Sequence, residues 1–333
     1  MNDLELNTAD TQQVISGRMA LAGCSSYQFQ TVLESVDRLI DLLGGIRRFV
    51  QSGDRVLVKP NFICTADTGG PAQTHPAVIL AIVRRLHESG ARVTVGDSPA
   101  WQDARACAAS LGLLDELEKL GIPLIQLNQP VRTRIDGSLI GISRHVLEAD
   151  KIINVPKFKT HQQIGATFAV KNLYGCVAGK EKAYRHFTRG HDPELFCRML
   201  LGIAARVAPV LHIIDAVTAM EGPGPIHGTA RHLNVLIGGD DPIACERVCC
   251  ELIGMNPESL PILRTAQRLH LWNCDEPLPE IAGDRLEQFR CETFQLAEPI
   301  PLRFTFPRIC KSIAKQIILL ALSPFRSGHK KGA

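Results

Sequence analysis

Aromatic residues are scarce in this chain of 333 residues, and neither sign of charge is in large excess. Aromatic side chains make up 5% of the sequence, and 37 basic residues stand against 34 acidic ones, for a net charge of +3. Proteins that bind nucleic acid usually present a basic surface, and those that bind single strands also need aromatic stacking platforms. We therefore expect no nucleic acid partner.

Several diagnostic motifs are absent from the sequence as well. No stretch approaches the roughly 20 apolar residues of a membrane-spanning helix,. Neither a Walker loop nor a G-x-G-x-x-G fingerprint occurs, so nucleotide binding by those routes is not predicted,. The sequence has no C-x-x-C and no H-E-x-x-H, which gives no basis for a ferredoxin-type cluster or a zinc site of that kind,. The cofactor therefore stays unknown at this stage.

The two ends of the chain differ in composition. Residues 1–15 are polar and lack the basic start and apolar stretch of a secretory signal, so we expect a disordered tail on a cytoplasmic protein,. Residues 301–333 hold basic side chains on both sides of the apolar run 317–322, which predicts a basic C-terminal helix and tail. Such a helix could pack on the body of the protein or lie on an anionic membrane surface.

Residues 16–300 carry an alternating pattern of strands and helices that predicts a single α/β domain. A mostly parallel sheet with alternating helices is expected, together with a small antiparallel hairpin at Asp136-Gly137, a strong turn signal. The expected strands are 19–23, 55–59, 92–96, 123–127, 131–135, 139–142, 151–155, 211–215 and 233–237. The expected helices are 31–50, 76–89, 103–120, 193–207, 242–252 and 261–269.

Polar residues gather where four of these strands end, which is where open α/β sheets bind their ligands. Period-two geometry puts Lys157, Lys159 and His161 on one face of an extended segment, a pattern suited to a carboxylate or phosphate. The alternative is an exposed edge strand protected by lysines. Lys171 lies in an otherwise apolar stretch, where an unpaired charge is costly, and this favours a site,.

We assign expected roles to the polar residues of these segments. A small anionic molecule would be bound and polarised by the lysines and oriented by the asparagines, with carboxylates available for proton transfer. Asp241 precedes a proline at a helix start, and capping of that helix would by itself explain it. The catalytic candidates are Lys159, His161, Lys171, Asp97 and Asp215, and the substrate-binding candidates are Lys59, Asn61, Asn154, Lys157, Asn172 and Asp241.

The same motifs, taken in order, resemble a known family. The resemblance runs from about residue 57 to about residue 254 and is to the bacterial and archaeal family called domain of unknown function 362. It rests on Val-Lys59-Pro-Asn61, Thr74-His-Pro, Gly96-Asp-Ser, Asn154-Val-Pro-Lys-Phe-Lys-Thr-His161, Lys171-Asn-Leu-Tyr-Gly175, Asp215-Ala, Glu221-Gly-Pro-Gly-Pro225 and Asp241-Pro-Ile-Ala.

The resemblance implies little about the reaction. Some relatives look like iron–sulfur proteins with an attached ferredoxin module, which implies a redox role and an electron-transfer partner. This chain lacks that module. It also has Cys245 where relatives more often have an acid, which weakens any role that depends on a carboxylate there.

Eleven cysteines are the unusual feature of the composition. Cys245 and Cys249 share one face of a predicted helix and are candidate ligands for a soft metal, although buried cysteine commonly acts as a small apolar side chain. Cys176 follows the Lys171 segment, where neighbouring lysines would activate a thiolate.

Three classes of function remain open, the third of which is a scaffold on a membrane surface. The first is an enzyme, with a redox link implied only by the resemblance, that acts on a small anion at the lysine and asparagine site. The second is a non-catalytic accessory protein that holds a metal, cluster or cofactor for a partner.

Overall fold

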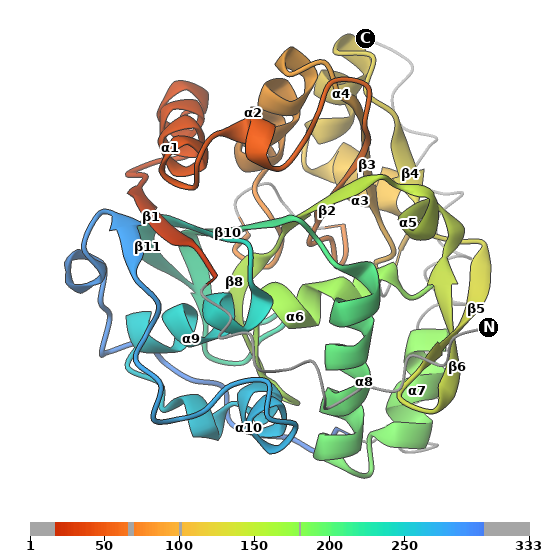
Figure 1. The fold of residues 1–333 in the computed structure, drawn as a ribbon, viewed down its shortest axis with the longest axis vertical. Helices are drawn as coiled ribbons and strands as arrows, with labels where there is room; N and C mark the ends of the chain where they lie inside the picture. The colour runs from red at the N-terminus through yellow and green to blue at the C-terminus, as the bar shows by residue number, and fades with distance from the viewer. Residues whose placement is uncertain (1–16, 66–69, 100–101, 180, 303–333) are drawn as a thin grey trace, which may run out of the picture.

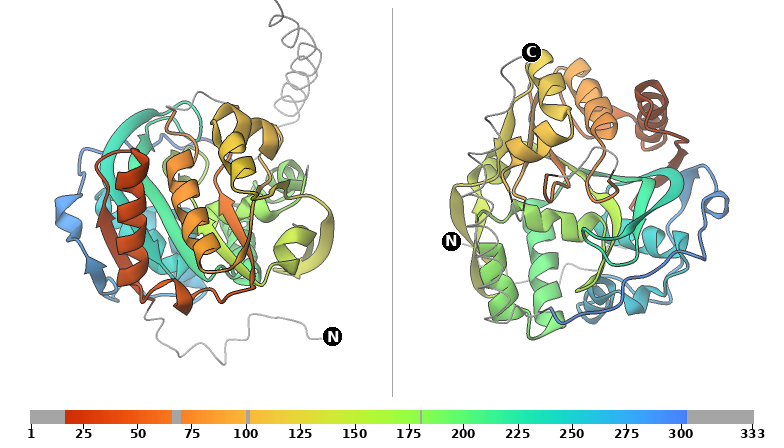
Figure 2. Two further views of the ribbon diagram at one scale, coloured as in Figure 1. Left: turned by 90° about the horizontal axis from the view of Figure 1, so that it is seen from above. Right: turned by 180° about the vertical axis from the view of Figure 1, so that it is seen from behind.

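The computed structural model describes residues 17–65, 70–99, 102–179 and 181–302, and they form a three-layer α/β/α arrangement. Figure 1 shows the sheet across the middle of the molecule with helices on both faces. The two further views in Figure 2 show the same layers. The fold class predicted from the sequence is therefore confirmed.

The central sheet combines a parallel half with an antiparallel half. Its strands lie in the order β12 (Ile281–Gly283), β1 (Met19–Gly23), β11 (Thr229–Gly239), β10 (Leu211–Glu221), β7 (Lys151–Val155), β2 (Arg55–Pro60), β3 (Arg92–Asp97) and β4 (Leu124–Gln126). Neighbouring strands from β10 to β4 are parallel, whereas β11 runs antiparallel to both β10 and β1. Strand β8 (Lys157–His161) pairs with β10 and with β9 (Gly165–Thr167).

Each face of the sheet packs against its own set of helices. One face is covered by α1 (Phe29–Leu42), α2 (Pro76–Glu88), α3 (Ala104–Ser110) and α4 (Leu113–Lys119). The other is covered by α6 (Ala169–Asn172), α8 (Pro193–Val207), α9 (Pro242–Leu252) and α10 (Pro261–Arg268). Alternate residues of a strand enter different cores: Val56 and Val58 pack under the first set, and Leu57 packs under the second,.

The remaining elements are short. The predicted hairpin is present as a separate two-stranded sheet of β5 (Pro130–Ile135) and β6 (Ser138–Ser143), whereas the strand after it, β7, lies in the main sheet. Helices α5 (Arg144–Glu148) and α7 (Glu181–Arg189) and the 3-10 turns η1 (Ile46–Arg48), η2 (Leu173–Cys176), η3 (Pro257–Ser259) and η4 (Leu286–Gln288) complete the described chain.

The structure corrects the lengths of several predicted elements. The helix expected over 31–50 ends at Leu42, before two consecutive glycines. The helix expected over 103–120 is two helices, because Gly112 adopts a left-handed backbone with φ of 67° between them,. The strands expected at 211–215 and 233–237 are each eleven residues long, because β10 and β11 pair along nearly their whole length.

No helix in the described residues is both long enough and apolar enough to cross a membrane. The expected N-terminal tail and the expected basic C-terminal helix fall almost entirely outside the described residues, as does the question of what that helix packs against.

Candidate functional site

The parallel strands carry their polar residues to one edge of the sheet. Lys59 of β2 lies opposite Asn154 of β7 in the strand register, and β3 ends at Asp97 beside them. The sequence folds this way because each strand is an apolar run closed by polar residues, and parallel strands present their carboxyl ends on the same side. Residues about 95 positions apart in the chain therefore meet here.

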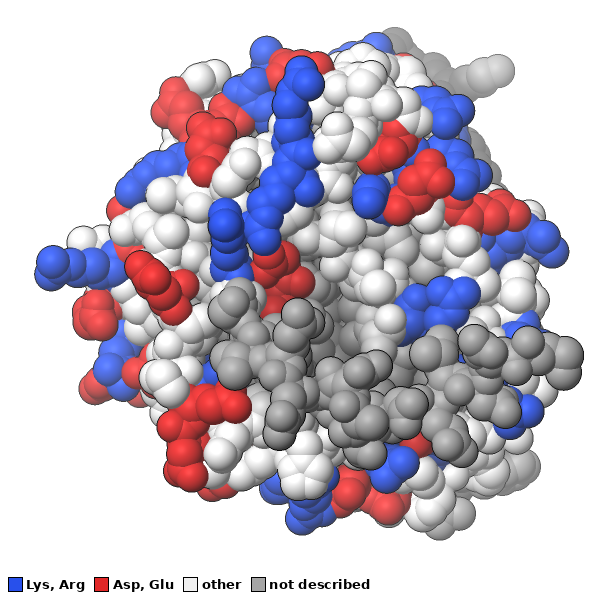
Figure 3. Space-filling view, viewed as in Figure 1, with Lys and Arg blue, Asp and Glu red and all other residues white. Residues whose placement is uncertain are grey.

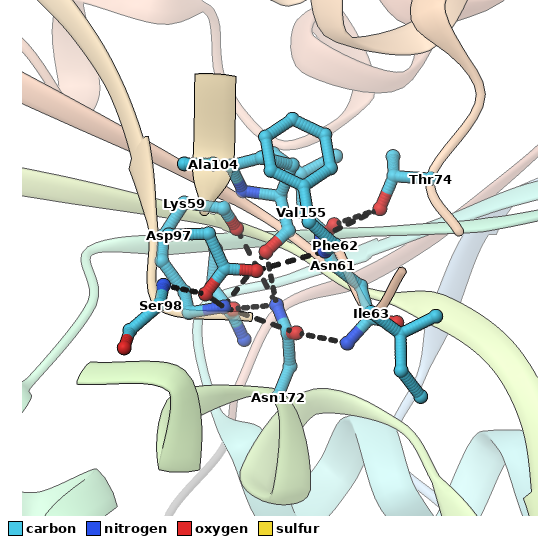
Figure 4. Close-up of polar contacts among 12 residues, drawn as sticks. Lys59, Asn61, Phe62, Ile63, Thr74, Asp97, Ser98, Ala104, Val155 and Asn172 are labelled. Atoms are coloured by element: carbon cyan, nitrogen blue, oxygen red, sulfur yellow. Dashed lines mark hydrogen bonds and ion pairs between the residues drawn. The ribbon is translucent and has the colours of Figure 1, made fainter. Parts of the chain in front are cut away.

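Lys59 and Asp97 form a buried ion pair at the centre of this edge (Figure 4). Their Nζ and Oδ1 atoms are 2.7 Å apart, and each side chain is 1% exposed. Asp97 also accepts hydrogen bonds from the backbone N–H groups of Phe62 and Ser98, at 2.8 and 2.7 Å. Lys59 donates to the carbonyl of Pro60 as well, at 2.7 Å. The pair is therefore held rigidly by the loops that follow β2 and β3.

Backbone of the segment after α6 lies directly over this ion pair. A Cβ atom at Gly175 would be 2.3 Å from Oδ1 of Asp97 and 2.6 Å from Nζ of Lys59. No side chain fits there, so glycine is required for the close approach. This contact brings η2, and the α6 turn before it, against the ends of the parallel strands.

Three asparagines extend the network away from the ion pair. Asn61 donates to Oδ1 of Asn172 at 2.7 Å, and Asn172 donates to Oδ1 of Asn154 at 2.8 Å. Asn154 in turn donates to the carbonyl of Ala169 at 2.9 Å, and its amide nitrogen is also 2.9 Å from Nδ1 of His212. The strand ends and α6 are thus joined by a continuous chain of side-chain amides.

Three further lysines surround this network. Lys159 is 1% exposed and donates to the carbonyl of Ala72 at 2.6 Å. The ammonium of Lys171 lies 4.6 Å from the centre of the Tyr174 ring. Lys182 donates to the carbonyl and, at 2.7 Å, to the hydroxyl of Ser98. We call Lys59, Lys159, Lys171 and Lys182 the lysine cluster.

Burial disfavours the charged form of these lysines. Burial, together with the positive charge of a neighbouring lysine, lowers the pKa of Lys159 and of Lys171 to about 7 each,. The pKa of Lys182 falls to about 8 for the same reasons, although Asp97 opposes the shift. Asp97 opposes the shift at Lys159 and Lys182, whereas the positive charges of Lys182 and Lys59 act on Lys171, so positive charge is in excess among the described residues.

Two histidines border the lysine cluster and are neutral at physiological pH. Burial and the charge of Lys171 lower the pKa of His186 to about 3 and hold that of His161 well below its usual value. His161 lies at the end of β8, as the sequence predicted, and its Nδ1 accepts the backbone N–H of Gln163 at 3.2 Å. A neutral imidazole adds no charge but offers a hydrogen bond.

Lys157 and Asp215 form a second buried pair, separate from the first. Their Nζ and Oδ2 atoms are 2.8 Å apart, and their side chains are 2% and 0% exposed. Tyr27 donates to Oδ1 of Asp215 and accepts from Lys157, both at 2.7 Å, and its ring stacks on His75 with 3.7 Å between ring centres. The backbone N–H of His75 donates to Asp215 at 2.9 Å. The polar groups of this second pair thus bond to one another and to their own neighbours, apart from the first pair.

Most sequence-predicted site residues are therefore brought together, but in two groups. The first holds Lys59, Asn61, Asp97, Asn154, Lys159, His161, Lys171 and Asn172, and the second holds Lys157 and Asp215. Asp241 belongs to neither group. It follows antiparallel β11, whose end lies beside the start of β10, and it accepts the N–H of Ala244 at 2.6 Å as the cap of α9.

The cysteines of α9 lie apart from this chemistry. Cys245 and Cys249 are fully buried in the core, and burial raises the pKa of each thiol well above its usual value. Burial likewise raises the pKa of Cys176 to about 12, so its thiol is not activated by the lysines nearby,. Within the described ranges, no group of three or more His, Cys, Asp or Glu side chains is arranged to hold a metal ion.

Sequence reasoning missed four residues in or beside these groups. One is Gln73, whose Oε1 accepts the backbone N–H of Ile63 at 2.9 Å next to Asn61. Tyr27 and Gln73 carried no signal except their position after or before a strand-end loop, while His75 appeared only as part of a motif. Lys182 lies in a charged stretch of the sequence that is typical of a solvated surface, and its ammonium instead donates to the hydroxyl of Ser98 beside the site.

The outer surface does not reveal the internal excess of positive charge. Figure 3 shows basic and acidic side chains intermixed on the described part of one face. The cationic character of the site thus comes from buried lysines and from no surface patch visible in that view.

The chain is thus a three-layer α/β/α protein. It has a cationic, asparagine-lined centre at the carboxyl ends of its parallel strands. The chain belongs to the family described as Domain of unknown function (DUF362), whose sequence profile matches residues 56–251. The resemblance inferred from the motifs is thereby confirmed.

The chain is also similar to two known proteins. A thylakoid-associated protein of Synechocystis sp. is 33% identical over 304 residues, which is 90% of this chain and 94% of the relative. The lactate racemase apoprotein from Thermoanaerobacterium thermosaccharolyticum is similar at a TM-score of 0.46 with 13% identity, over 70% of this chain and 56% of that chain. Similarity at this second level identifies neither a ligand nor a reaction.

Proposed function

We propose that the protein is an enzyme that binds a small carboxylate or phosphate at the lysine cluster and transfers a proton to or from it. The observation that carries the proposal is the charge balance at the site: among the described residues, four buried or partly buried lysines are accompanied by one carboxylate, Asp97. Buried charges are normally paired, so an unmatched set favours an anion as the missing partner.

The lysines differ in the hydrogen bonds that they already make, and we expect their roles to differ accordingly. Lys59 is saturated by Asp97, the Pro60 carbonyl and Asn172, so we expect it to position the network. Among the described residues, Lys159 has one hydrogen-bond acceptor and Lys171 has a ring contact alone, which leaves N–H groups on both to bind an anion,.

The same two lysines are suited to move a proton. An amine with a pKa near the working pH exists in both forms and can accept and return a proton efficiently. The pKa values of Lys159 and Lys171 are about 7 in the unliganded site. In the proposed step a neutral amine takes a proton from the substrate and becomes an ammonium, and the neighbouring lysine supplies the positive charge that stabilises the anion formed. The step needs no electron donor.

The binding part is tested with the full chain and a panel of small carboxylates and phosphates. We expect at least one to raise the Tm, and Lys159→Ala and Lys171→Ala each to weaken its binding about tenfold or more in calorimetry, as for loss of a charged hydrogen bond. Lys151→Ala is the matched control, because Lys151 begins β7 at the opposite edge of the sheet. If neither site variant changes any ligand response, the assignment is wrong.

The enzyme and the accessory protein are separated by charge-conserving variants. Arginine keeps its positive charge at neutral pH but does not act as a base. Lys159→Arg and Lys171→Arg should retain anion binding while losing exchange of substrate protons with deuterated water, followed by NMR. An accessory protein shows no such exchange in the wild type, and its purified form carries a metal, cluster or cofactor in stoichiometric amount.

A further inference from the structure

The amides of the three asparagines can point in one direction only. The carbonyl of Ala169 can accept but not donate, so the group of Asn154 that is 2.9 Å from it must be the NH₂,. Oδ1 of Asn154 therefore faces Asn172, which must donate to it and turn its own Oδ1 to Asn61. Asn61 is thus forced to use its NH₂ in the chain, and its Oδ1 atom points elsewhere.

Oδ1 of Asn61 is buried and accepts no hydrogen bond from any residue that the structure describes. The amide nitrogen of Gln73, a residue that is 3% exposed, is likewise buried and donates none. The orientation of Gln73 is also fixed, because its Oε1 accepts the backbone N–H of Ile63 at 2.9 Å. A buried polar group left without a partner is costly, so one unused acceptor and one unused donor require an explanation.

Both unused groups belong to one pair of facing segments. Asn61 donates its backbone N–H to the Thr74 hydroxyl at 2.8 Å, and the N–H of Thr74 donates back to the carbonyl of Asn61 at 3.1 Å. Residues 61–63 and 73–74 are therefore fixed against each other, and with them the two free amide groups.

The lysine cluster adjoins these two segments. Lys159 donates to the carbonyl of Ala72, the residue before Gln73, and Lys59 shares with Asn61 the same oxygen of Asn172, at 3.3 and 2.7 Å. The other unpartnered acceptor, Oε2 of Glu246, is on α9, and the free nitrogen of His212 is on β10. Among the described residues, a free donor and a free acceptor occur together beside cations at this place.

We propose that the anion bound at the lysine cluster carries a hydroxyl group, which donates to Oδ1 of Asn61 and accepts from the amide nitrogen of Gln73. This inference rests on the proposed function and narrows its substrate class to a hydroxycarboxylate or a phosphate ester of a polyol. A hydroxyl is the smallest group that both donates and accepts. A simple carboxylate could accept from the amide nitrogen of Gln73 but would leave Oδ1 of Asn61 without a donor.

Sites built to hydrogen-bond a hydroxyl reject analogues that lack it, because their own buried groups then stay unpaired. The test compares matched ligands by calorimetry on the full chain: glycolate with acetate, and glycerol 3-phosphate with propyl phosphate. We expect the hydroxylated member of at least one pair to bind about tenfold or more tightly. The pair that shows the difference separates a carboxylate from a phosphate substrate.

The Gln73→Glu variant tests whether the side-chain amide of Gln73 causes this difference in affinity. The substitution keeps an oxygen for the N–H of Ile63 and replaces the donor by a second oxygen, so the affinity ratio within the pair should fall close to one. Gln126→Glu is the control, because Gln126 also accepts a backbone N–H, that of Ala104 at 2.7 Å, and gains the same charge. The affinity ratio within the ligand pair should be unchanged in the Gln126→Glu variant.

The outcomes distinguish the two proposals. Equal affinities within both pairs, with lysine variants that abolish binding of all four ligands, would overturn the hydroxyl site and leave the proposed function intact. If no anion binds to the protein, both the hydroxyl site and the proposed function are wrong. If Gln73→Glu fails to fold, as judged by circular dichroism, the comparison of matched ligands on the wild-type protein still decides the question.

Discussion

The two buried lysine–aspartate pairs of this protein have the same chemistry and different surroundings. In the Lys157–Asp215 pair, Tyr27 and the backbone N–H of His75 complete the bonds of the carboxylate, and one positive charge meets one negative charge. The Lys59–Asp97 pair has equally short bonds, but it is accompanied by three more lysines.

This difference indicates that a buried ion pair does not by itself mark a functional site. The closed pair clamps the end of β1 to the middle of the sheet, since Tyr27 follows β1 and Asp215 lies in β10. The open pair anchors a group whose charges are unmatched. The balance of charge around the pair separates the two, and the following predictions test that separation.

Loss of the closed pair should have the largest effect. Asp215→Ala leaves the ammonium of Lys157 and the hydroxyl of Tyr27 buried without their partner. We expect a loss of about 3–5 kcal/mol in the free energy of unfolding, measured by urea denaturation. The double variant with Lys157→Met should recover much of it. A loss below about 1 kcal/mol would show that water replaces the carboxylate.

The open pair should respond less and should be repaired by added anions. Asp97→Ala removes the bonds to Lys59, Phe62 and Ser98, and we expect a loss of about 2–4 kcal/mol,. Millimolar acetate or formate should restore part of the Tm, because the lysine cluster attracts an anion into the space left. The same salts should not restore Asp215→Ala. Equal responses of the two variants would remove the distinction between the pairs.

Anion affinity should fall as the pH rises. Lys159 and Lys171, with pKa values of about 7, are mainly protonated at pH 6 and mainly neutral at pH 8. Each lysine that must be charged to bind therefore costs about tenfold in affinity across this range. Sulfate is the suitable probe, since its charge is constant there. Lys171→Arg should flatten the profile, and an affinity that is unchanged between these pH values in the wild type would contradict the assignment.

The smallest effect is expected at the thiols. Cys249→Ala removes a buried sulfur from the core, and we expect a loss of about 1 kcal/mol in the free energy of unfolding,. Sulfate affinity should remain within twofold of wild type, roughly the error of such a comparison. A large loss of anion binding would tie the cysteines of α9 to the site.

The sequence predicted most of the fold because local signals and global packing agree. Apolar runs closed by Pro60 or Asp97 became strands, and Pro193 and Pro242 begin helices where expected. The predicted lengths of strands were wrong where pairing with a distant strand decides the length, as in the long hairpin of β10 and β11.

The sequence named most of the polar residues that the structure brings together, and it predicted their grouping less well. The rule that ligands bind at strand ends placed Lys59, Asp97 and Asn154 together. It could not separate Lys157 from Lys159, because their difference depends on Tyr27 and Ala72, which approach from distant parts of the chain. Orientation of the amides likewise required a backbone carbonyl that no pattern reveals.

The position of β1 has a consequence for how the protein is made. Leu21 of β1 pairs with Ile237 of β11 and with Gly283 of β12, yet it is synthesised more than 200 residues before either. At about 5–20 residues per second, an emerging chain holds this apolar strand without its partners for roughly 10–40 seconds. The first strand off the ribosome is thus among the last to be completed, and chaperones have that interval in which to bind it.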